Sequence, residues 1–339
     1  MTDDPDGSPP RVTKRRWFLK RAELEARANT TRAEIRAQVN STRAEIRAQV
    51  KATKAQIDAT TVKIEARTGR NLPLAIVIGL ALGFTMLFSL IVIKQLFMIF
   101  AGGLIGFTAF ELASALRYAG RDVPRWPTVI AALAVVPAAF YLGDRGHWLV
   151  MLAGVLFVSS WRVAELAHPG HRGGARALWT DLAAGTFIQV YVAFLASFAV
   201  LLTGKPGGEW WALAFLLLVV SIDTGAYASG LSFGKHPMAP RISPKKTWEG
   251  FAGSVVIALL GGILLAVFML HQSWWFGLVF GATIVFTATV GDLIESLIKR
   301  DLGIKDISTW LPGHGGFLDR LDSVLPSAAA AYLLFLIFA

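Results

Sequence analysis

The sequence predicts an all-α polytopic integral membrane protein with about nine transmembrane helices and an N-terminal helical extension of 11-residue repeats. Three observations support this prediction. Hydrophobic residues make up 54% of the 339 positions. The mean hydropathy of +0.54 is above that of ordinary soluble domains. The charged residues concentrate in the first 70 positions, and long apolar runs fill the rest of the chain.

We expect three parts along the chain: a disordered basic segment (1–28), an amphipathic helical repeat arm (29–70) and a transmembrane domain that holds the active site (71–339). The repeat is visible in NTTRAEIRAQV (29–39) and NSTRAEIRAQV (40–50), with a degenerate third copy, KATKAQIDATT (51–61). Alanine, glutamate, arginine and glutamine favour a helix. An 11-residue period keeps one apolar stripe aligned along it.

The arm is basic, because residues 1–70 hold 16 Lys and Arg against 9 Asp and Glu. A basic amphipathic helix beside a membrane predicts binding to anionic membrane lipids. Two alternatives stay open for the arm: a right-handed coiled coil that joins two chains as a homodimer, and a solvated spacer. The sequence contains no nucleic-acid recognition motif, so nucleic acid is not an expected partner.

Nine apolar runs are the candidates for crossing a membrane: 72–93, 95–116, 127–143, 147–162, 181–203, 209–230, 250–271, 274–292 and 323–339. Lysine and arginine concentrate in every second connection, whereas the alternate connections hold only Lys94, Arg145 and Lys205. The positive-inside rule then predicts a multi-pass protein of the cell (inner) membrane, with its N-terminus and its active site on the cytoplasmic side.

A charged stretch, GDLIESLIKRDLGIKDISTWLPGHGGFLDRLD (291–322), lies between two of these runs. Helical spacing places Asp292, Glu295, Ser296, Lys299 and Arg300 on one face. Carboxylate and hydroxyl oxygens are the ligands that hard divalent cations prefer. The stretch therefore predicts a metal- and phosphate-handling site. The alternative is a set of salt bridges between residues four apart on a cytoplasmic helix.

The glycine-rich turn of this stretch contains His314, Gly315 and Gly316. Glycines allow backbone amides to approach an anionic ligand closely. Asp319 follows the turn and is placed to act as a second carboxylate beside Asp292. A single histidine between glycines does not predict a zinc site.

A second polar segment begins with Asp223 in DTGAYASG (223–230) and continues through SPKKTWEG (243–250). Paired lysines flanked by hydroxyl groups suit a triphosphate. The candidate ligands for that group are Ser243, Lys245, Lys246 and Thr247. Ordinary positive-inside topology is the alternative explanation of the two lysines.

Other polar residues within apolar runs are harder to interpret. Glu111 could be a site carboxylate, or it could reach the membrane interface beside Arg117. Asp181 and Gln189 lie in the fifth run, where we expect interhelical hydrogen bonds.

The segments SLIKR (296–300), KD (305–306) and LPGHGGFLDRLD (311–322), supported by SPKKTWEG, resemble the signature of the phosphatidate cytidylyltransferase (CDP-diacylglycerol synthase) family. No signature position departs from the pattern. The resemblance extends over roughly residues 72–339 and leaves out the repeat arm. It implies an enzyme of phospholipid biosynthesis that converts CTP and phosphatidic acid into CDP-diacylglycerol and pyrophosphate, with magnesium and, as a candidate second ion, potassium.

The resemblance also implies roles for the residues above. Asp292 and Asp319 would bind the metal, with Ser296 as a further ligand. The nucleotide-binding set would comprise Asp223, Ser243, Lys245, Lys246, Thr247, His314, Gly315 and Gly316. The cations that meet the lipid phosphate or the leaving pyrophosphate would be Lys299, Arg300 and Arg320.

Two other functions compete with this one. A transporter or flippase would use the charged cluster as a gate, but its paired charges should lie at mid-membrane rather than in loops and helix ends. A related CTP-dependent lipid kinase would share the substrate CTP but would lack the signature centred on HGG.

Overall fold

The computed structural model describes residues 72–168, 174–308, 310 and 315–339. The chain divides into two compact units, Met1–Leu72 and Pro73–Ala339, and the described residues belong almost entirely to the second. The predicted basic segment (1–28) and repeat arm (29–70) lie outside the described residues, so their structure stays a prediction.

The regular secondary structure of the described residues is helical apart from one short hairpin, as expected for an all-α protein. The elements in order are α2 (Leu72–Val92), α3 (Lys94–Tyr118), α4 (Arg125–Glu165), α5 (Ala175–Ile188), η2 (Gln189–Phe194), α6 (Leu195–Thr203), α7 (Gly208–Phe233), β1 (Pro237–Ala239), β2 (Ser243–Thr247), α8 (Trp248–Phe268), α9 (Trp274–Asp301), α10 (Leu318–Leu321) and α11 (Val324–Phe338). The segment η2 is a single π-helical stretch within a continuous helix, Ala175–Thr203.

Seven helices among the described residues are long and apolar enough to cross a membrane. They are α3, α4, Ala175–Thr203, α7, α8, α9 and the helix Leu318–Phe338 formed by α10 and α11. In α2, the described apolar stretch Gly79–Val92 is shorter. Nine crossings therefore stay an expectation, and α4 contains two of the nine predicted runs.

The helix α4 folds back on itself at Gly143. This glycine has φ 64° and ψ −152°, a backbone conformation that residues with a side chain rarely adopt. A Cβ added at Gly154, in the second half, would lie 3.3 Å from the Cβ of Ala131 in the first half. In a straight helix those residues would be about 35 Å apart. The two predicted runs 127–143 and 147–162 are thus the two arms of a helical hairpin.

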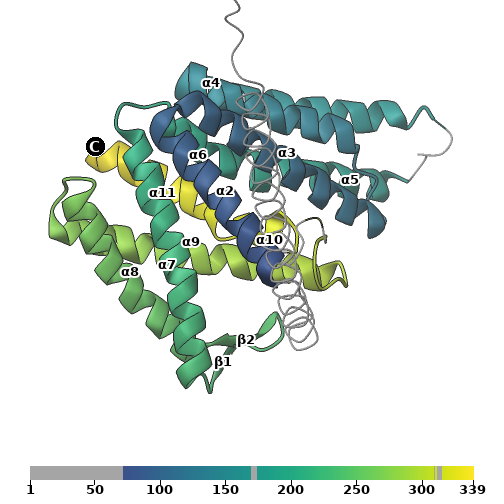
Figure 1. Cartoon of the computed structure of the whole chain (residues 1–339). Coiled ribbons are helices and arrows are strands. Elements are labelled where there is room, and N and C mark those ends of the chain that lie inside the picture. The colour runs from purple at the N-terminus through teal and green to yellow at the C-terminus, as the bar shows by residue number, and fades with distance from the viewer. Residues whose placement is uncertain (1–71, 169–173, 309, 311–314) are drawn as a thin grey trace, which may run out of the picture. The chain divides into compact units, whose positions relative to one another are not determined.

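Small residues bring the backbones of α8 and α9 together. A Cβ added at Gly262 of α8 would lie only 3.0 Å from the Cα of Gly281 in α9. Such close approach is typical of helix pairs in membranes, where packing replaces the hydrophobic effect as the main source of association. Helix α8 also packs along α7. The helices α7, α8 and α9 therefore form one packed group, and the β1–β2 hairpin lies at one end of it (Figure 1).

The basic segment between α7 and α8 forms an antiparallel hairpin, β1–β2, at the end of α7 (Figure 1). The Glu249 carboxylate accepts hydrogen bonds from the backbone N–H groups of Lys235 and His236, at 3.1 and 3.2 Å. The Thr247 hydroxyl accepts one from the N–H of Gly250, at 3.2 Å, and so caps α8. Both ends of the hairpin are tied to the start of α8, which holds the two lysines of β2 in place.

Buried polar contacts join α4 to the helix Ala175–Thr203. Arg162 Nη2 lies 2.9 Å from Asp181 Oδ2, and both side chains are buried. The Asp122 N–H donates to Asp181 Oδ1 at 2.9 Å. Gln189 Nε2 donates to the carbonyl of Thr128 at 2.8 Å. The predicted interhelical hydrogen bonds of Asp181 and Gln189 are confirmed.

Candidate active site

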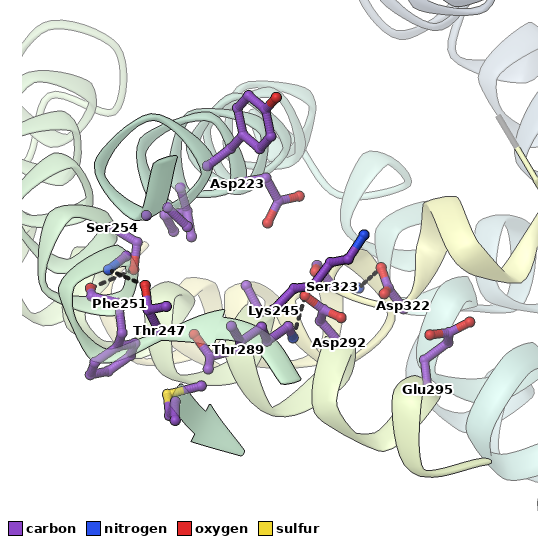
Figure 2. A pocket seen from close by; sticks show the side chains of 18 of the residues that line it. Asp223, Lys245, Thr247, Phe251, Ser254, Thr289, Asp292, Glu295, Asp322 and Ser323 are labelled. Carbon is purple, nitrogen blue, oxygen red and sulfur yellow. Dashed lines mark hydrogen bonds and ion pairs between the residues drawn. The ribbon is translucent and has the colours of Figure 1, made fainter. Parts of the chain in front are cut away.

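A cavity of about 590 Å³ lies where the ends of α7, α9 and α10 meet β2 and the start of α8. Its walls bring together residues from both polar segments of the sequence (Figure 2). The lining residues are Ile222, Asp223, Ala226, Tyr227, Gly230, Leu231, Met238, Lys245, Lys246, Thr247, Gly250, Phe251, Ser254, Ala288, Thr289, Asp292, Glu295, Lys299, Asp319, Asp322 and Ser323. One part of the wall is therefore apolar, and another part carries both carboxylates and lysines.

Three carboxylates form the acidic end of this cavity. One oxygen from each of Asp292, Glu295 and Asp322 lies within 4.8 Å of the other two. Asp292 and Glu295 are three residues apart on α9, which places both on one face. Asp322 joins them because α9 contacts the backbone after α10: a Cβ added at Gly291 would lie 3.1 Å from the carbonyl carbon of Asp322.

The chemistry of this acidic group fits a divalent cation. Glu295 is 1% exposed, and its Oε1 has no hydrogen-bond partner within the part of the chain that the structure describes. A buried carboxylate oxygen without a donor is costly unless a cation satisfies it. Magnesium binds to one or two carboxylates together with substrate phosphates, and oxygens from Asp292 and Asp322 are close enough to share such an ion.

Two lysines face the carboxylates. Lys246 of β2 forms an ion pair with Asp292 Oδ2. Lys299 Nζ lies 2.6 Å from Glu295 Oε2 and 3.3 Å from Asp319 Oδ1. The cavity therefore alternates positive and negative groups, which suits a ligand that combines phosphates with a metal ion.

The glycine turn surrounds the Asp319 side chain. The Gly316 N–H donates to Asp319 Oδ2 at 2.8 Å. Gly315 has φ +83°, and a Cβ added there would lie 2.6 Å from the same oxygen. The predicted close approach of a glycine amide to an anion therefore occurs, but in the structure that anion is the carboxylate of Asp319. His314 lies outside the described residues.

The structure brings together seven of the predicted site residues in the lining of the cavity. They are Asp223, Lys245, Lys246, Thr247, Asp292, Lys299 and Asp319. In Figure 2, Thr247 lies toward one end of the cavity and Asp292 toward the other, with Asp223 across from them. Residues predicted from two separate segments thus share one cavity.

Six other predicted residues do not line the cavity: Ser243, Ser296, Arg300, Gly315, Gly316 and Arg320. Ser296 is buried on α9 and lies outside the cavity lining, although helical spacing predicted it on the same face as Asp292 and Glu295. Arg300 Nε donates to the carbonyl of Ile242 at 3.1 Å, which ties α9 to the turn of the β1–β2 hairpin.

Sequence reasoning did not assign Glu295 and Asp322 as metal ligands. The spacing of Glu295 from Asp292 was a visible signal, because residues three apart share a helix face. Asp322 carried a weaker signal, three residues after Asp319. Its place beside Asp292 depends on the contact of Gly291 in α9 with the backbone after α10, which a sequence pattern does not reveal.

Glu111 takes neither of the two predicted roles. Its side chain is buried, 2% exposed, and does not line the cavity. Its carboxylate accepts hydrogen bonds from the N–H groups of Phe317 and Leu318, at 3.2 and 2.8 Å. Glu111 therefore supports the segment that leads into Asp319.

Comparison with known proteins identifies the family of this chain. The sequence model of the cytidylyltransferase family matches residues 74–338. A phosphatidate cytidylyltransferase of Mycobacterium tuberculosis (strain ATCC 25618 / H37Rv) is 38% identical over 274 residues, 79% of this chain and 83% of the relative. That of Mycobacterium leprae (strain TN) is 38% identical over 280 residues, 80% and 90% of the two chains. That of Brucella suis biovar 1 (strain 1330) is 34% identical over 262 residues, 72% and 89%.

Proposed function

Because this chain belongs to the cytidylyltransferase family, and to the phosphatidate cytidylyltransferases within it, we propose that it transfers CMP from CTP to phosphatidic acid at the cytoplasmic face of the cell membrane. The products are CDP-diacylglycerol and pyrophosphate. The observation that carries the proposal is the single cavity in which Lys246 of the basic hairpin meets Asp292 of the charged stretch.

A magnesium ion would be held by Asp292, Glu295 and Asp322, whose oxygens lie within 4.8 Å of one another. The sequence-based hypothesis named Asp319 and Ser296 beside Asp292. Asp319, whose partners are Lys299 and the Gly316 N–H, lines the same cavity and stays a predicted ligand. When bound, the ion would neutralise charge on the CTP phosphates and increase the electrophilicity of the α-phosphorus. Potassium as a second cation stays a prediction.

The nucleophile is a phosphate oxygen of phosphatidic acid, which is already anionic near neutral pH. This oxygen forms a bond to the α-phosphorus of CTP while the bond from that phosphorus to the oxygen bridging the α and β phosphates breaks, releasing pyrophosphate. The reaction needs no covalent enzyme intermediate and no general base. It needs two polyanions held in line and their charge offset.

The lysines of the cavity supply that charge. Lys245 and Lys246 line the cavity from β2, with Lys246 paired to Asp292, and both can bind the triphosphate. Lys299, on α9 between Glu295 and Asp319, can bind the leaving pyrophosphate or the lipid phosphate. Arg300 and Arg320 stay candidates for the same phosphates from outside the cavity wall.

The apolar part of the cavity suits a lipid substrate. Ile222, Leu231, Met238 and Phe251 line it beside the charged groups. Many side chains of α7 and α8, such as Leu264, are exposed on the outside of the helices, as expected of surfaces in contact with lipid tails. A substrate with a phosphate head and two acyl chains could thus reach the site from the bilayer.

The cytoplasmic orientation is supported by the charge bias of the connections. The β1–β2 hairpin and the segment from Lys299 to Arg320 are rich in basic residues, which favours the cytoplasmic side. Family membership selects the enzyme over the transporter, the flippase and the lipid kinase. Binding of anionic lipids through the repeat arm, and homodimer formation, stay predictions.

The test is a reaction of the purified full-length protein in detergent with CTP, phosphatidic acid and Mg²⁺. We expect stoichiometric release of pyrophosphate and a lipid product with the mass of CDP-diacylglycerol. Omission of either substrate serves as the control. A lipid product that carries a phosphoryl group in place of CMP would instead support the kinase.

A further inference from the structure

Helix α3 anchors the segment that carries two of the site carboxylates. We propose that Glu111 is a positioning residue, which acts through the backbone of residues 316–318 to set the places of Asp319 and Asp322. The proposal rests on the proposed function, because it gives Glu111 its effect through the metal and phosphate site. Glu111 itself does not line the cavity.

Three donors from one segment converge on the Glu111 carboxylate. The Ser308 hydroxyl donates to Oε1, the Phe317 N–H donates to Oε1 at 3.2 Å, and the Leu318 N–H donates to Oε2 at 2.8 Å. Glu111 is 2% exposed, so water does not compete for these bonds. Hydrogen bonds to a charged group in such a place are stronger than neutral ones. The carboxylate therefore joins Ser308, Phe317 and Leu318 to α3.

Aromatic packing reinforces the same attachment. The rings of Phe107 on α3 and Phe317 are stacked with their centroids 5.0 Å apart. Phe110 follows one helical turn along α3, and its ring centroid lies 5.6 Å from that of Trp310. Stacked and tilted aromatic pairs of this kind add to the stability gained by burial. Trp310 and Phe317 thus add apolar contacts with α3 to the polar contacts of Glu111.

The connection from Glu111 to the site is short. The Gly316 N–H donates to Asp319 Oδ2 at 2.8 Å, while the next two N–H groups donate to Glu111. A Cβ added at Gly316 would lie 2.8 Å from Glu111 Cδ, so only glycine allows the carboxylate to come this close. Asp322, one turn after Asp319, moves with the same backbone.

A carboxylate is needed here rather than an amide. Both Glu111 oxygens accept hydrogen bonds from N–H groups of the segment. A glutamine has one acceptor oxygen, and its NH₂ group would face a backbone N–H. The change E111Q therefore keeps the size of the side chain but leaves one buried donor without an acceptor.

The experiment compares E111Q with E209Q in the full-length protein in detergent. Glu209 pairs with Lys94 at the other end of α3, at 2.7 Å, and lies in the first turn of α7, whereas the cavity residues of that helix begin at Ile222. Binding of Mn²⁺ is measured directly from the loss of the free-ion signal in electron paramagnetic resonance. Turnover is measured separately as a function of Mg²⁺ concentration.

We expect Mn²⁺ to bind E111Q about 10–100-fold more weakly than wild type, as for other residues that orient metal ligands. Half-maximal turnover should need correspondingly more Mg²⁺, while E209Q should match wild type in both measurements. S308A removes one donor and should shift both values in the same direction by less. Wild-type Mn²⁺ binding by E111Q would refute the proposal.

Two further outcomes are separable. If E111Q does not fold, S308A decides: wild-type Mn²⁺ affinity in S308A counts against the positioning role. If the wild-type protein binds Mn²⁺ but gives no CDP-diacylglycerol, the proposed function fails, whereas the difference in Mn²⁺ affinity between E111Q and wild type still tests the role of Glu111.

Discussion

Lys246 of the β1–β2 hairpin forms an ion pair with Asp292 of α9. The two residues come from the two polar segments that the sequence singled out, and each offsets the charge of the other at the wall of one cavity. A triphosphate with a divalent cation offers each of them a new partner of opposite sign. Exchange of partners lets the site accept a highly charged ligand without burying an unpaired charge.

Replacing Lys246 should weaken the binding of CTP. Loss of a charge-assisted hydrogen bond to phosphate costs about 1.5–3 kcal/mol, which corresponds to roughly a 10–100-fold increase in the KM for CTP. We expect this increase for K246A in steady-state assays of pyrophosphate release. R241A removes a positive charge from the turn of the same hairpin, outside the cavity, and should keep the wild-type KM. Equal KM values for K246A and wild type would remove Lys246 from the nucleotide site.

Substitution of the carboxylates distinguishes the two sets of metal ligands. If Asp292, Glu295 and Asp322 hold the ion, then E295Q and D322N should each lower turnover by roughly 100-fold or more, since electrostatic groups at the reacting centre contribute that much. S296A should remain near wild type, because Ser296 does not line the cavity. D301N, at the exposed end of α9, is the control for loss of one negative charge. If D322N kept the turnover of the wild type while S296A lost it, the result would favour the set of ligands predicted from the sequence.

Removal of metal should act on stability as well as on activity. A ligand that binds only the folded state raises the unfolding temperature, and the gain in stability grows with the logarithm of 1 + [ligand]/Kd. We expect Mg²⁺ to raise the Tm of the EDTA-treated protein and to restore turnover. The D292N variant should show neither effect. The measurement is a thermal scan of intrinsic tryptophan fluorescence in detergent, and a Tm that rises equally in D292N would place the ion elsewhere.

A methyl group at Gly291 should separate α9 from the turn after α10. A Cβ added there would lie 2.8 Å from Pro326 Cγ and 3.1 Å from the carbonyl carbon of Asp322. G291A should therefore move Asp322 away from Asp292 and weaken Mn²⁺ binding by about 10-fold or more, in the range seen when the surroundings of metal ligands change. G103A is the matched control, because an added Cβ at Gly103 meets nothing within 4 Å. Unchanged Mn²⁺ affinity in G291A would show that this contact does not set the site.

Patterns among residues close together in the sequence predicted the helices and the helix faces. Hydropathy indicated an all-helical membrane domain, and the structure has seven helices of suitable length and composition among the described residues. The spacing of Asp292, Glu295 and Lys299 placed them on one face of α9, and all three line the cavity. The signature resemblance named the family, which the match over residues 74–338 confirms.

The same patterns could not predict contacts between segments that are far apart in the sequence. Asp322 reaches Asp292 because two backbones meet at Gly291. Glu111 contacts residues about two hundred positions later in the chain, so its role stayed open. The glycine turn predicted an amide close to an anion, but nothing in the sequence indicated that the anion is Asp319.

The reversal of α4 at Gly143 has a consequence for the whole path of the chain. Between Glu111 and Phe317 lie the two arms of α4, the span Ala175–Thr203, α7, α8 and α9, which would make an even number of passages through a bilayer if each crosses it once. An even number returns the chain to the side it left, as the hydrogen bond between these two residues requires. With a straight α4 the number would be odd, and α3 would end on the opposite surface from the segment it holds. The positive-φ backbone conformation of Gly143 thus makes the number of passages even. It thereby places the end of α3 on the same side of the bilayer as the site residues that it supports.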